Sequence, residues 1–348
     1  IPDITSMTRE ALKETGLDNK AVVKCKNMFA LGICFYLFDR PEAYAYKYLE
    51  TKFARKNPVV AQANKLAIDA GYNYAANTHQ FANTYTVAPA PLEKGTYRTV
   101  NGNVATAWGL CAAAEKAGLP LFCGSYPITP ATVILEELAK RKDLGVKTVQ
   151  AEDEIAGICT AIGAAFAGNF AVTTTSGPGL SLKSEALGLA VMTELPLVVV
   201  DVQRGGPSTG LPTKTEQSDL SQALYGRNGE CPVIVVAASS PSDCFHYAFE
   251  AGRLAMEHMT PVILLTDGFI ANGSEPWRIP SMKDYPAIQP PIVDDAPEGG
   301  FMPYVRDEKL ARGWAFPGKV GLEHRVGGLE KDCVKGCISH DPANHQKM

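Results

Sequence analysis

The stretch "VKTVQAEDEIAGICTAIGAAFAGNFAVTTT" (residues 146–175) predicts a strand, a helix and a second strand in direct succession. Residues 147–151 and 170–175 are short runs bounded by polar or small residues, which is typical of strands. Between them, residues 154–167 repeat Ile, Ala and Gly at helical spacing. Two strands joined through a helix lie parallel in one sheet, so this stretch predicts a β–α–β unit.

The same alternation continues from about residue 101 to residue 275. Runs such as "LPLVVV" (195–200) and "PVILL" (261–265) are apolar throughout, which indicates strands buried on both faces. We therefore predict an α/β fold whose parallel sheet is covered by helices on both faces. Helices are expected at 103–117, 130–142, 154–167, 179–193 and 242–258. Strands are expected at 119–124, 147–151, 170–175, 196–203, 232–238 and 261–266.

The flanking segments have a different character. Residues 1–80 are expected to be mostly helical, with a buried apolar segment "NMFALGICFYLF" (27–38) and helices opened by prolines at 41–56 and 57–75. Residues 81–100 lose periodicity and are interpreted as a linker. Residues 276–348 are rich in Pro and Gly and are interpreted as an extended connecting arm.

Composition narrows the class of protein. The chain has 348 residues, 46% of them hydrophobic and 20% charged, which suits two domains with separate cores. Its formal net charge of −4 argues against a nucleic-acid or anionic-membrane partner. The longest apolar runs are too short to span a bilayer. The first residue is Ile1 rather than Met, which is compatible with a fragment of a longer chain.

Nine cysteines are scattered along the chain without C-x-x-C spacing. Several lie inside apolar runs such as "LGICF" (31–35) and "LFCG" (121–124), which favours reduced, buried thiols in the cytoplasm. Cys333 and Cys337 are four residues apart, with His340 and His345 nearby. A zinc site there is the less favoured alternative, because a second ligand pair at matching spacing is missing.

Four loops follow predicted strands and should meet at one edge of the sheet, where ligands bind in folds of this class. They are "GSYPITPAT" (124–132), "QAEDEIAG" (150–157), "TTTSGPGLS" (173–181) and "VQRGGPSTGLPTKTEQSD" (202–219). Taken singly, each has a structural explanation. Thr129 suits a helix N-cap, "TSGPG" a tight turn, Arg204 a solvated charge, and the acids a helix dipole. Their common position at one edge favours a binding site.

Glu154 is the most informative of the three acids in "QAEDEIAG". It precedes "IAGICTAIGAAFAG" (155–168), a helix of small residues that must pack closely on its neighbours. A carboxyl group at the start of such a helix should be partly desolvated, and it could share a proton with a ligand nitrogen. Glu152 and Asp153 are interpreted as solvated acids of the first turn.

In this order, "GSYPITPAT", "QAEDEIAGICTAIGAAFAG", "TTTSGPGLSL" and "DVQRGGPSTGLPT" closely resemble the alpha subunit of 2-oxoacid:ferredoxin oxidoreductases. The 2-oxoglutarate type is the nearest in appearance. The resemblance covers roughly residues 100–348, and residues 1–80 resemble the end of the family's gamma domain. It implies that residues 101–275 form the domain that binds the pyrimidine of thiamine diphosphate. It also implies that the start of the gamma domain and a domain beyond the arm lie outside this chain.

The resemblance assigns roles to individual residues. Glu154 would contact the pyrimidine nitrogen, because Gly163 follows it by the nine residues common in thiamine enzymes, whereas Glu152 would require a glycine at Ala161. Arg204 would hold the 2-oxoacid carboxylate, with Thr129 and Thr213 beside the substrate. Further cofactor contacts are implied at Tyr126, Pro127, Ser176 and Gly177.

One departure from the family's complete enzyme matters. The G-D-G motif that holds the diphosphate and Mg²⁺ is missing, since Asn272 follows Asp267 and Gly268 far too closely, and no cysteine set for a [4Fe-4S] cluster is present. The resemblance places both on a separate beta subunit. It therefore implies a hetero-oligomer that uses coenzyme A and ferredoxin. The alternatives from other classes are a non-catalytic nucleotide- or phosphate-binding α/β module and a structural subunit.

Overall fold

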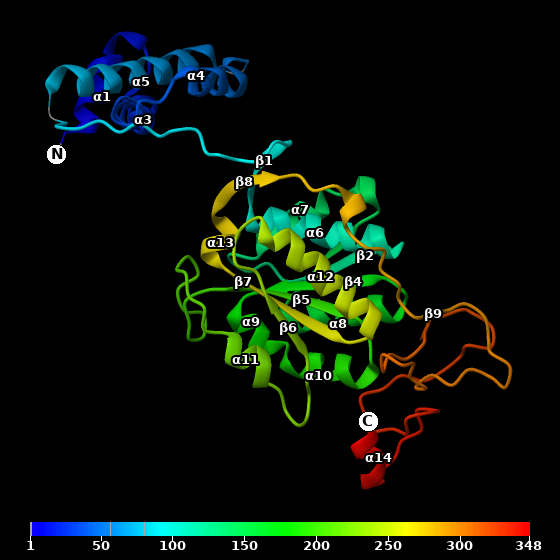
Figure 1. Cartoon of the computed structure of the whole chain (residues 1–348). Coiled ribbons are helices and arrows are strands. Elements are labelled where there is room, and N and C mark those ends of the chain that lie inside the picture. Colours follow the sequence, from blue (N-terminus) through cyan, green and yellow to red (C-terminus); the bar gives the residue numbers. More distant parts are fainter. Residues whose placement is uncertain (1, 56, 80) are drawn as a thin grey trace. The chain divides into compact units, whose positions relative to one another are not determined.

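The computed structural model describes residues 2–55, 57–79 and 81–348 (Figure 1). The chain folds into two compact units, Ile1–Lys94 and Gly95–Met348. The predicted linker 81–100 therefore contains the boundary, and its end belongs to a strand of the second unit. The assignment of residues 1–80 to a gamma-like domain stays a prediction.

The first unit is helical, as predicted. Its helices are α1 (Ile4–Leu12), α2 (Asn19–Lys24), α3 (Lys26–Leu37), α4 (Ala43–Leu49) and α5 (Pro58–Thr78), with a 3-10 turn at Lys13–Thr15 and a π turn at Glu50–Ala54. Helices α3 and α5 cross at two glycines. A Cβ on Gly32 would lie 2.0 Å from the Ile68 carbonyl oxygen, and one on Gly71 would lie 1.9 Å from that of Phe29. Only glycine lets the two backbones approach so closely.

Proline and asparagine start α5 as its sequence predicts. Pro58 lies at the first position of the helix, and the Asn57 side chain accepts a hydrogen bond from the Val60 amide at 3.2 Å. The expected helix 41–56 corresponds to α4, which begins at Ala43. Residue 56, the last residue of the expected helix, lies outside the described residues. Burial of segment 27–38 is only partial, because Cys34 and Phe38 are exposed while Phe29 and Ile33 are buried.

The second unit is built on a six-stranded parallel sheet in the order β3-β2-β4-β5-β7-β6, which confirms the predicted fold class. Its strands are β2 (Leu121–Ser125), β3 (Lys147–Gln150), β4 (Phe170–Thr175), β5 (Leu197–Gln203), β6 (Ile234–Ala237) and β7 (Pro261–Asp267). Every residue of β4, β5 and β7 is buried. These strands occupy the centre of the sheet, and β5 and β7 are accordingly apolar for most of their length, whereas the second half of β4 is threonine.

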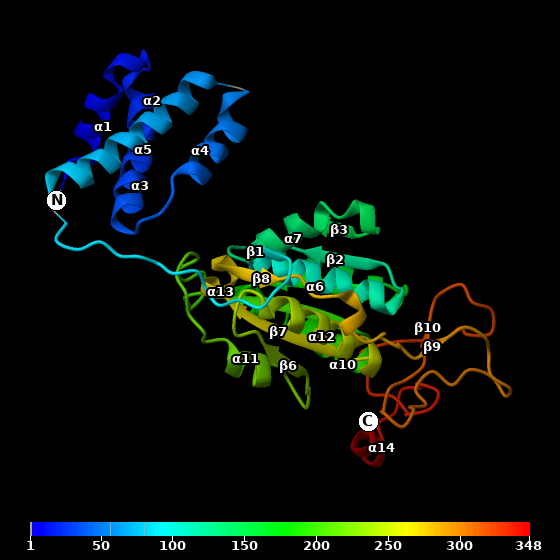
Figure 2. The ribbon, with the colours of Figure 1, turned by 45° about the horizontal axis from the view of Figure 1, so that its top comes forward.

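Helices cover both faces of this sheet (Figures 1 and 2). Val198, Val200 and Val202 of β5 point into the core formed with α6 (Gly102–Ala117), α7 (Thr132–Ala139) and α12 (Asp243–His258). Leu197 and Val199 point into the opposite core. That core is formed with α8 (Glu154–Phe166), α9 (Gly177–Leu182), α10 (Ser184–Thr193) and α11 (Leu220–Tyr225). Alternating side chains thus give each face its own helical layer.

The small residues of α8 allow it to lie almost on the backbone of β2. A Cβ on Gly124 would lie 2.2 Å from the Thr160 hydroxyl and 2.7 Å from the Gly157 carbonyl oxygen. A Cβ on Gly157 would lie 3.3 Å from the Ser125 Cα. The close packing predicted for this helix is therefore present, and it brings the first turn of α8 to the carboxyl edge of the sheet.

Two predicted helices differ from their expected limits. The expected helix 179–193 is two helices, α9 and α10, which meet at Lys183. The expected helix 130–142 is the shorter α7, whose N-cap is Ala131 and lacks a side-chain capping bond. Thr129 therefore does not cap this helix, and that expectation is wrong. The helices α11 and α13 (Gly268–Asn272) were not predicted, and neither were the strands outside the main sheet.

The remaining strands lie outside the main sheet. Strand β1 (Tyr97–Asn101) pairs antiparallel with β8 (Ser274–Arg278), and β9 (Ile292–Val293) pairs with β10 (Trp314–Ala315). The predicted arm contains little regular structure besides a 3-10 turn at Met282–Asp284 and α14 (Pro342–Lys347). It is nevertheless anchored, because the buried Trp314 indole donates to the Ala165 carbonyl oxygen at 3.1 Å.

Within the described ranges, no helix is both long enough and apolar enough to cross a membrane. Each of the nine cysteines, all in the described part of the chain, is a free thiol. Cys25, Cys123 and Cys244 are buried as expected, whereas Cys34, Cys159 and Cys337 are exposed.

Candidate functional site

The loops after β2, β3, β4 and β5 meet at the carboxyl edge of the parallel sheet, as the sequence predicts. The Ala151 amide donates to the Ser125 carbonyl oxygen at 2.9 Å and joins the first two loops. The Ser125 hydroxyl donates to the Thr174 carbonyl oxygen at 2.8 Å and joins the first loop to the end of β4. Side chains from three strand ends are thereby brought together.

Glu154 is the first residue of α8 and is only 8% exposed. Its side chain lies against the glycine-rich turn after β4, which comprises residues 175–179 and includes the start of α9. A Cβ on Gly179 would lie 2.7 Å from the Glu154 Cγ and 2.0 Å from the Thr175 hydroxyl. The turn must therefore carry glycine there, and the carboxyl group is held at the rim of the sheet in a poorly hydrated position.

The two neighbouring acids are exposed. The Asp153 side chain accepts a hydrogen bond from the Ala156 amide at 2.8 Å and is the N-cap of α8. Glu152 precedes the cap and is also exposed. The structure thus separates Glu154 from the other acids of "QAEDEIAG" by burial. Gly163 lies on the exposed side of α8, where a Cβ would meet no atom within 4 Å.

Lys183 is a buried residue near Glu154 that was not predicted from the sequence. Its ammonium donates to the Glu154 carbonyl oxygen at 2.7 Å from the junction of α9 and α10. Burial lowers the pKa of Lys183 to about 8, although the charge of Glu154 opposes this shift. The sequence feature that could have indicated this burial is a single lysine within the largely apolar segment "GLSLKSEALGLA" (179–190). Few positions in such a segment are exposed to solvent.

Replacing Lys183 by methionine is expected to stabilise the fold at neutral pH. The pKa is about 8 in the folded chain and 10.5 ordinarily, so burial of the charge costs up to about 3 kcal/mol. The unfolded chain binds this proton more tightly, so wild-type stability should rise between pH 8 and 10.5, and the variant's advantage should shrink there.

Urea unfolding at pH 7 and at pH 10 measures both effects. The exposed Lys142 supplies the matched control, because its change to methionine removes a solvated charge. A Lys183→Met variant that is less stable than wild type at both pH values would contradict the assignment of a desolvated ammonium.

The glycine-rich turn offers polar groups without partners. Ser176 is fully buried, and its hydroxyl has no hydrogen-bond partner in the described part of the chain. A Cβ on Gly177 would lie 2.8 Å from either carboxyl oxygen of Asp219. Tyr126 and Pro127, from the loop after β2, are 37% exposed and half-buried respectively. An exposed tyrosine and an unpaired hydroxyl suit a bound group, so the residues fit the pyrimidine half of thiamine diphosphate.

Arg204 is buried, at 5% exposure, which excludes the solvated surface charge as its explanation. Its guanidinium donates to the Thr129 carbonyl oxygen at 2.7 Å and to the Thr209 carbonyl oxygen at 2.8 Å, while Nε has no partner among described residues. It lines a cavity of about 740 Å³ together with Gly177, Ser208 and Asp219. A buried cation at a cavity wall is suited to an anionic ligand group.

The structure places the two predicted threonines differently. Thr129 contacts Arg204 through its main-chain carbonyl, and its side chain is exposed. Thr213 is also exposed and does not belong to the residues that line the 740 Å³ cavity. The loop after β2 is further tied to the domain by Asn103, whose side chain donates to the Pro130 carbonyl oxygen at 3.0 Å. Asn103 was not predicted, because its partner is 27 residues away.

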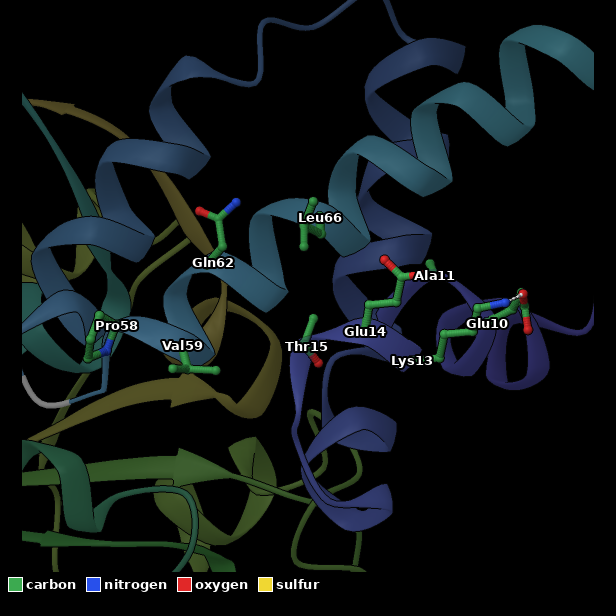
Figure 3. Close-up of a pocket in the computed structure, with 9 residues that line it drawn as sticks. All are labelled: Glu10, Ala11, Lys13, Glu14, Thr15, Pro58, Val59, Gln62 and Leu66. Atoms are coloured by element: carbon green, nitrogen blue, oxygen red, sulfur yellow. Dashed lines mark hydrogen bonds and ion pairs between the residues drawn. The ribbon is translucent and has the colours of Figure 1, made fainter.

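A second cavity lies within the helical unit, between α1 and α5 (Figure 3). It has a volume of about 680 Å³ and is lined by Glu10, Ala11, Lys13, Glu14, Thr15, Pro58, Val59, Gln62 and Leu66. Lys13 pairs with Glu10 at its rim. None of the residues predicted from the sequence to form the site lines this cavity.

Known proteins resemble this chain over almost its whole length. A protein-family model described as pyruvate flavodoxin/ferredoxin oxidoreductase, thiamine diphosphate-binding, matches residues 113–338. The 2-oxoglutarate oxidoreductase subunit KorA of Mycobacterium tuberculosis is 56% identical over 346 residues, which cover 99% of this chain and 52% of the relative. The 2-oxoglutarate synthase subunit KorA of Methanothermobacter marburgensis is 43% identical over 250 residues, covering 72% and 64%.

A solved structure gives the same result. The 2-oxoglutarate:ferredoxin oxidoreductase from Magnetococcus marinus, with 2-oxoglutarate, coenzyme A and succinyl-CoA bound, superposes with a TM-score of 0.86 at 38% identity. The match covers 98% of this chain and 57% of that one, so the chain spans about half the length of several of its relatives. The resemblance noted in the sequence is thus confirmed, and the chain belongs to the thiamine diphosphate-binding family of pyruvate flavodoxin/ferredoxin oxidoreductases, beside alpha subunits of 2-oxoacid:ferredoxin oxidoreductases.

Proposed function

We propose that this chain forms the pyrimidine-binding half of the active site in a thiamine diphosphate-dependent 2-oxoacid:ferredoxin oxidoreductase, with 2-oxoglutarate as substrate. The observation that carries this proposal is the buried Glu154 carboxyl group, which lies at the carboxyl edge of the sheet and packs against Gly179, where a Cβ would lie 2.7 Å from its Cγ. The choice of 2-oxoglutarate is supported by the names of the relatives and the ligands of the solved structure.

The proposed reaction converts 2-oxoglutarate, coenzyme A and two oxidised ferredoxins into succinyl-CoA, carbon dioxide, two reduced ferredoxins and a proton. When bound, thiamine diphosphate supplies the carbon nucleophile and the electron sink for this chemistry. The protein's own contribution is to hold the reactants in place and to exclude water.

Glu154 would bond a nitrogen of the cofactor's pyrimidine ring and exchange a proton with it. Its position at the first turn of α8 fixes the carboxyl group, and the close packing of α8 on β2 leaves it little freedom to move. Lys183 would assist by holding the Glu154 main chain. Ser176 and Gly177 would contact the same ring from the opposing turn, together with Tyr126 and Pro127.

Arg204 would receive the carboxylate of the 2-oxoacid. Its two terminal nitrogens are held by main-chain carbonyl oxygens, so the plane of the guanidinium is set before substrate arrives. A buried, oriented guanidinium can contact a carboxylate through two parallel hydrogen bonds. Thr129, from the loop after β2, and Thr213, from the loop that carries Arg204, would lie beside the substrate; both are exposed, and Thr213 lies outside the 740 Å³ cavity.

The Mg²⁺, the diphosphate and a [4Fe-4S] cluster would be held by a beta subunit. This chain carries neither the G-D-G motif nor a cysteine set for a cluster. We therefore expect a hetero-oligomer in which coenzyme A and ferredoxin meet the site at the border between the subunits. The free thiols of the nine cysteines suit a cytoplasmic enzyme.

The isolated chain is expected to lack 2-oxoacid oxidation and to bind thiamine diphosphate weakly. Viologen reduction with 2-oxoglutarate and coenzyme A, measured with and without the co-expressed beta subunit, tests the activity. Calorimetric titration with thiamine diphosphate and with ATP tests the ligand. Turnover by the chain alone would contradict the divided site, and binding of ATP without thiamine diphosphate would favour a phosphate-binding module instead.

A further inference from the structure

The loop that carries Arg204 begins after β5 and returns to the sheet at Asp219; residues 204–218 form this Arg204 loop. Its interior is held by its own main chain. The Gly205 amide donates to the Lys214 carbonyl oxygen at 2.9 Å, and the Leu211 amide to the Gly205 carbonyl oxygen at 2.8 Å. These bonds give the loop a shape, but they do not fix that shape to the rest of the domain.

The two ends of the loop are joined at the rim of the sheet. The main-chain amide of Asp219 donates to the Gln203 side-chain oxygen at 2.9 Å. The side-chain nitrogen of Gln203 in turn donates to the Thr266 carbonyl oxygen at 3.1 Å. Gln217 donates to an Asp267 oxygen at 2.7 Å. The returning end of the loop is therefore attached to β5 and β7.

The Asp219 carboxyl group adds a contact to the opposite wall. Its oxygens occupy the space that a Cβ on Gly177 would need, at 2.8 Å. Gly177, Arg204 and Asp219 line the same 740 Å³ cavity. The carboxyl group thus meets the glycine-rich turn at the place where the returning end of the Arg204 loop closes this cavity.

A second carboxyl group, that of Asp201 in β5, lies within hydrogen-bonding reach of Asp219. Asp201 is fully buried, and neither of its oxygens meets a hydrogen-bond donor of the described residues. Burial, and next the charge of Asp219, raise the pKa of Asp201 well above its usual range, and burial also raises the pKa of Asp219. Two such carboxyl groups remain together when they share one proton.

We propose that Asp219 is a positioning residue that fixes the Arg204 loop against Gly177 and so sets how tightly Arg204 holds the substrate carboxylate. In this proposal Asp219 acts through the Arg204 loop and not through a contact of its own with substrate or cofactor. The proposal rests on the proposed function of Arg204, but the fixation of the loop can be measured without any substrate.

The test compares Asp219→Ala with Asp219→Asn in the full chain and in the enzyme assembled with its beta subunit. Asparagine keeps the shape and can donate to Asp201 without a shared proton, whereas alanine removes the contact. Asp295, an exposed acid in the arm, provides the control variant Asp295→Ala. Hydrogen exchange of residues 204–218 reports loop fixation, and KM and kcat for 2-oxoglutarate report the substrate.

Asp219→Ala should raise the exchange of the loop amides and the KM by about tenfold or more, with kcat changed less than about threefold. Asp219→Asn should restore both to within about threefold of wild type. Wild-type exchange of residues 204–218 in Asp219→Ala would overturn the proposed fixation of the loop. An equal fall of activity in the alanine and asparagine variants would also overturn it. If Asp219→Ala does not fold, Asp219→Ser replaces it. An assembled enzyme that turns over no 2-oxoacid would overturn the proposed function. The hydrogen-exchange result would still show whether Asp219 fixes the Arg204 loop.

Discussion

Replacing Glu154 by glutamine is expected to reduce the turnover of the assembled enzyme by about 10²–10⁴-fold, the range typical of an acid–base group. Glutamine preserves the volume beside Gly179 and can still offer a hydrogen bond, but it cannot exchange a proton with the ring nitrogen. The thermal unfolding temperature should change little, because Glu154 is one side chain at the end of a well-packed helix. Steady-state viologen reduction with saturating 2-oxoglutarate and coenzyme A measures the loss.

The two exposed acids of the same turn are the matched controls. Glu152→Gln and Asp153→Asn should keep activity within a few-fold of wild type, since such dipole-facing acids contribute about 0.3–1 kcal/mol each. Asparagine also preserves the N-cap that Asp153 provides. If Glu152→Gln is inactive and Glu154→Gln is active, the assignment on this helix is wrong by two residues.

Replacing Arg204 by alanine is expected to raise the KM for 2-oxoglutarate by roughly 30- to 5,000-fold. This corresponds to about 2–5 kcal/mol for the loss of one partner of a desolvated, charge-assisted pair. Arg204→Lys should recover only part of the affinity, because an ammonium cannot make the two parallel contacts of a guanidinium. Initial rates over a range of 2-oxoglutarate concentrations separate KM from kcat.

Arg227 allows a control with similar chemistry outside the cavity. Its guanidinium also donates to main-chain carbonyl oxygens, those of Ala223 at 2.7 Å and Leu224 at 2.8 Å, but it does not line the 740 Å³ cavity. Arg227→Ala should therefore lower stability without changing KM. An unchanged KM in Arg204→Ala would remove Arg204 from the substrate site.

The main sheet was predictable because its central strands are buried on both faces and alternate with helices. β4 and β5 begin and end within a residue of the predicted limits. The break at Lys183 was not predicted, since apolar periodicity continues through it. Thr129 was misplaced for a local reason: a threonine before Pro130 has the sequence of a cap, but the helix starts two residues later than such a cap would require.

In the candidate site, only those residues could be predicted whose own loop sequence indicates a function. Glu154 and Arg204 were singled out from their loops and both are buried, and the roles given to them stay predictions. Asp201, Asp219 and Asn103 could not be found in this way, because each acts through a partner far along the chain. Asp201 lies within the apolar run of β5. The role of a buried acid there can be argued only when its neighbour, Asp219, is known from the structure.

The bond between Glu154 and the pyrimidine of thiamine diphosphate is the central element of the proposed function. Exchange of the C2 proton of the bound cofactor, followed by rapid quench in deuterated buffer, tests it most directly because no substrate is needed. We expect Glu154→Gln in the assembled enzyme to slow this exchange by about 10²–10⁴-fold, while Glu152→Gln exchanges at the wild-type rate. Wild-type exchange in Glu154→Gln, with the cofactor bound, would contradict the claim.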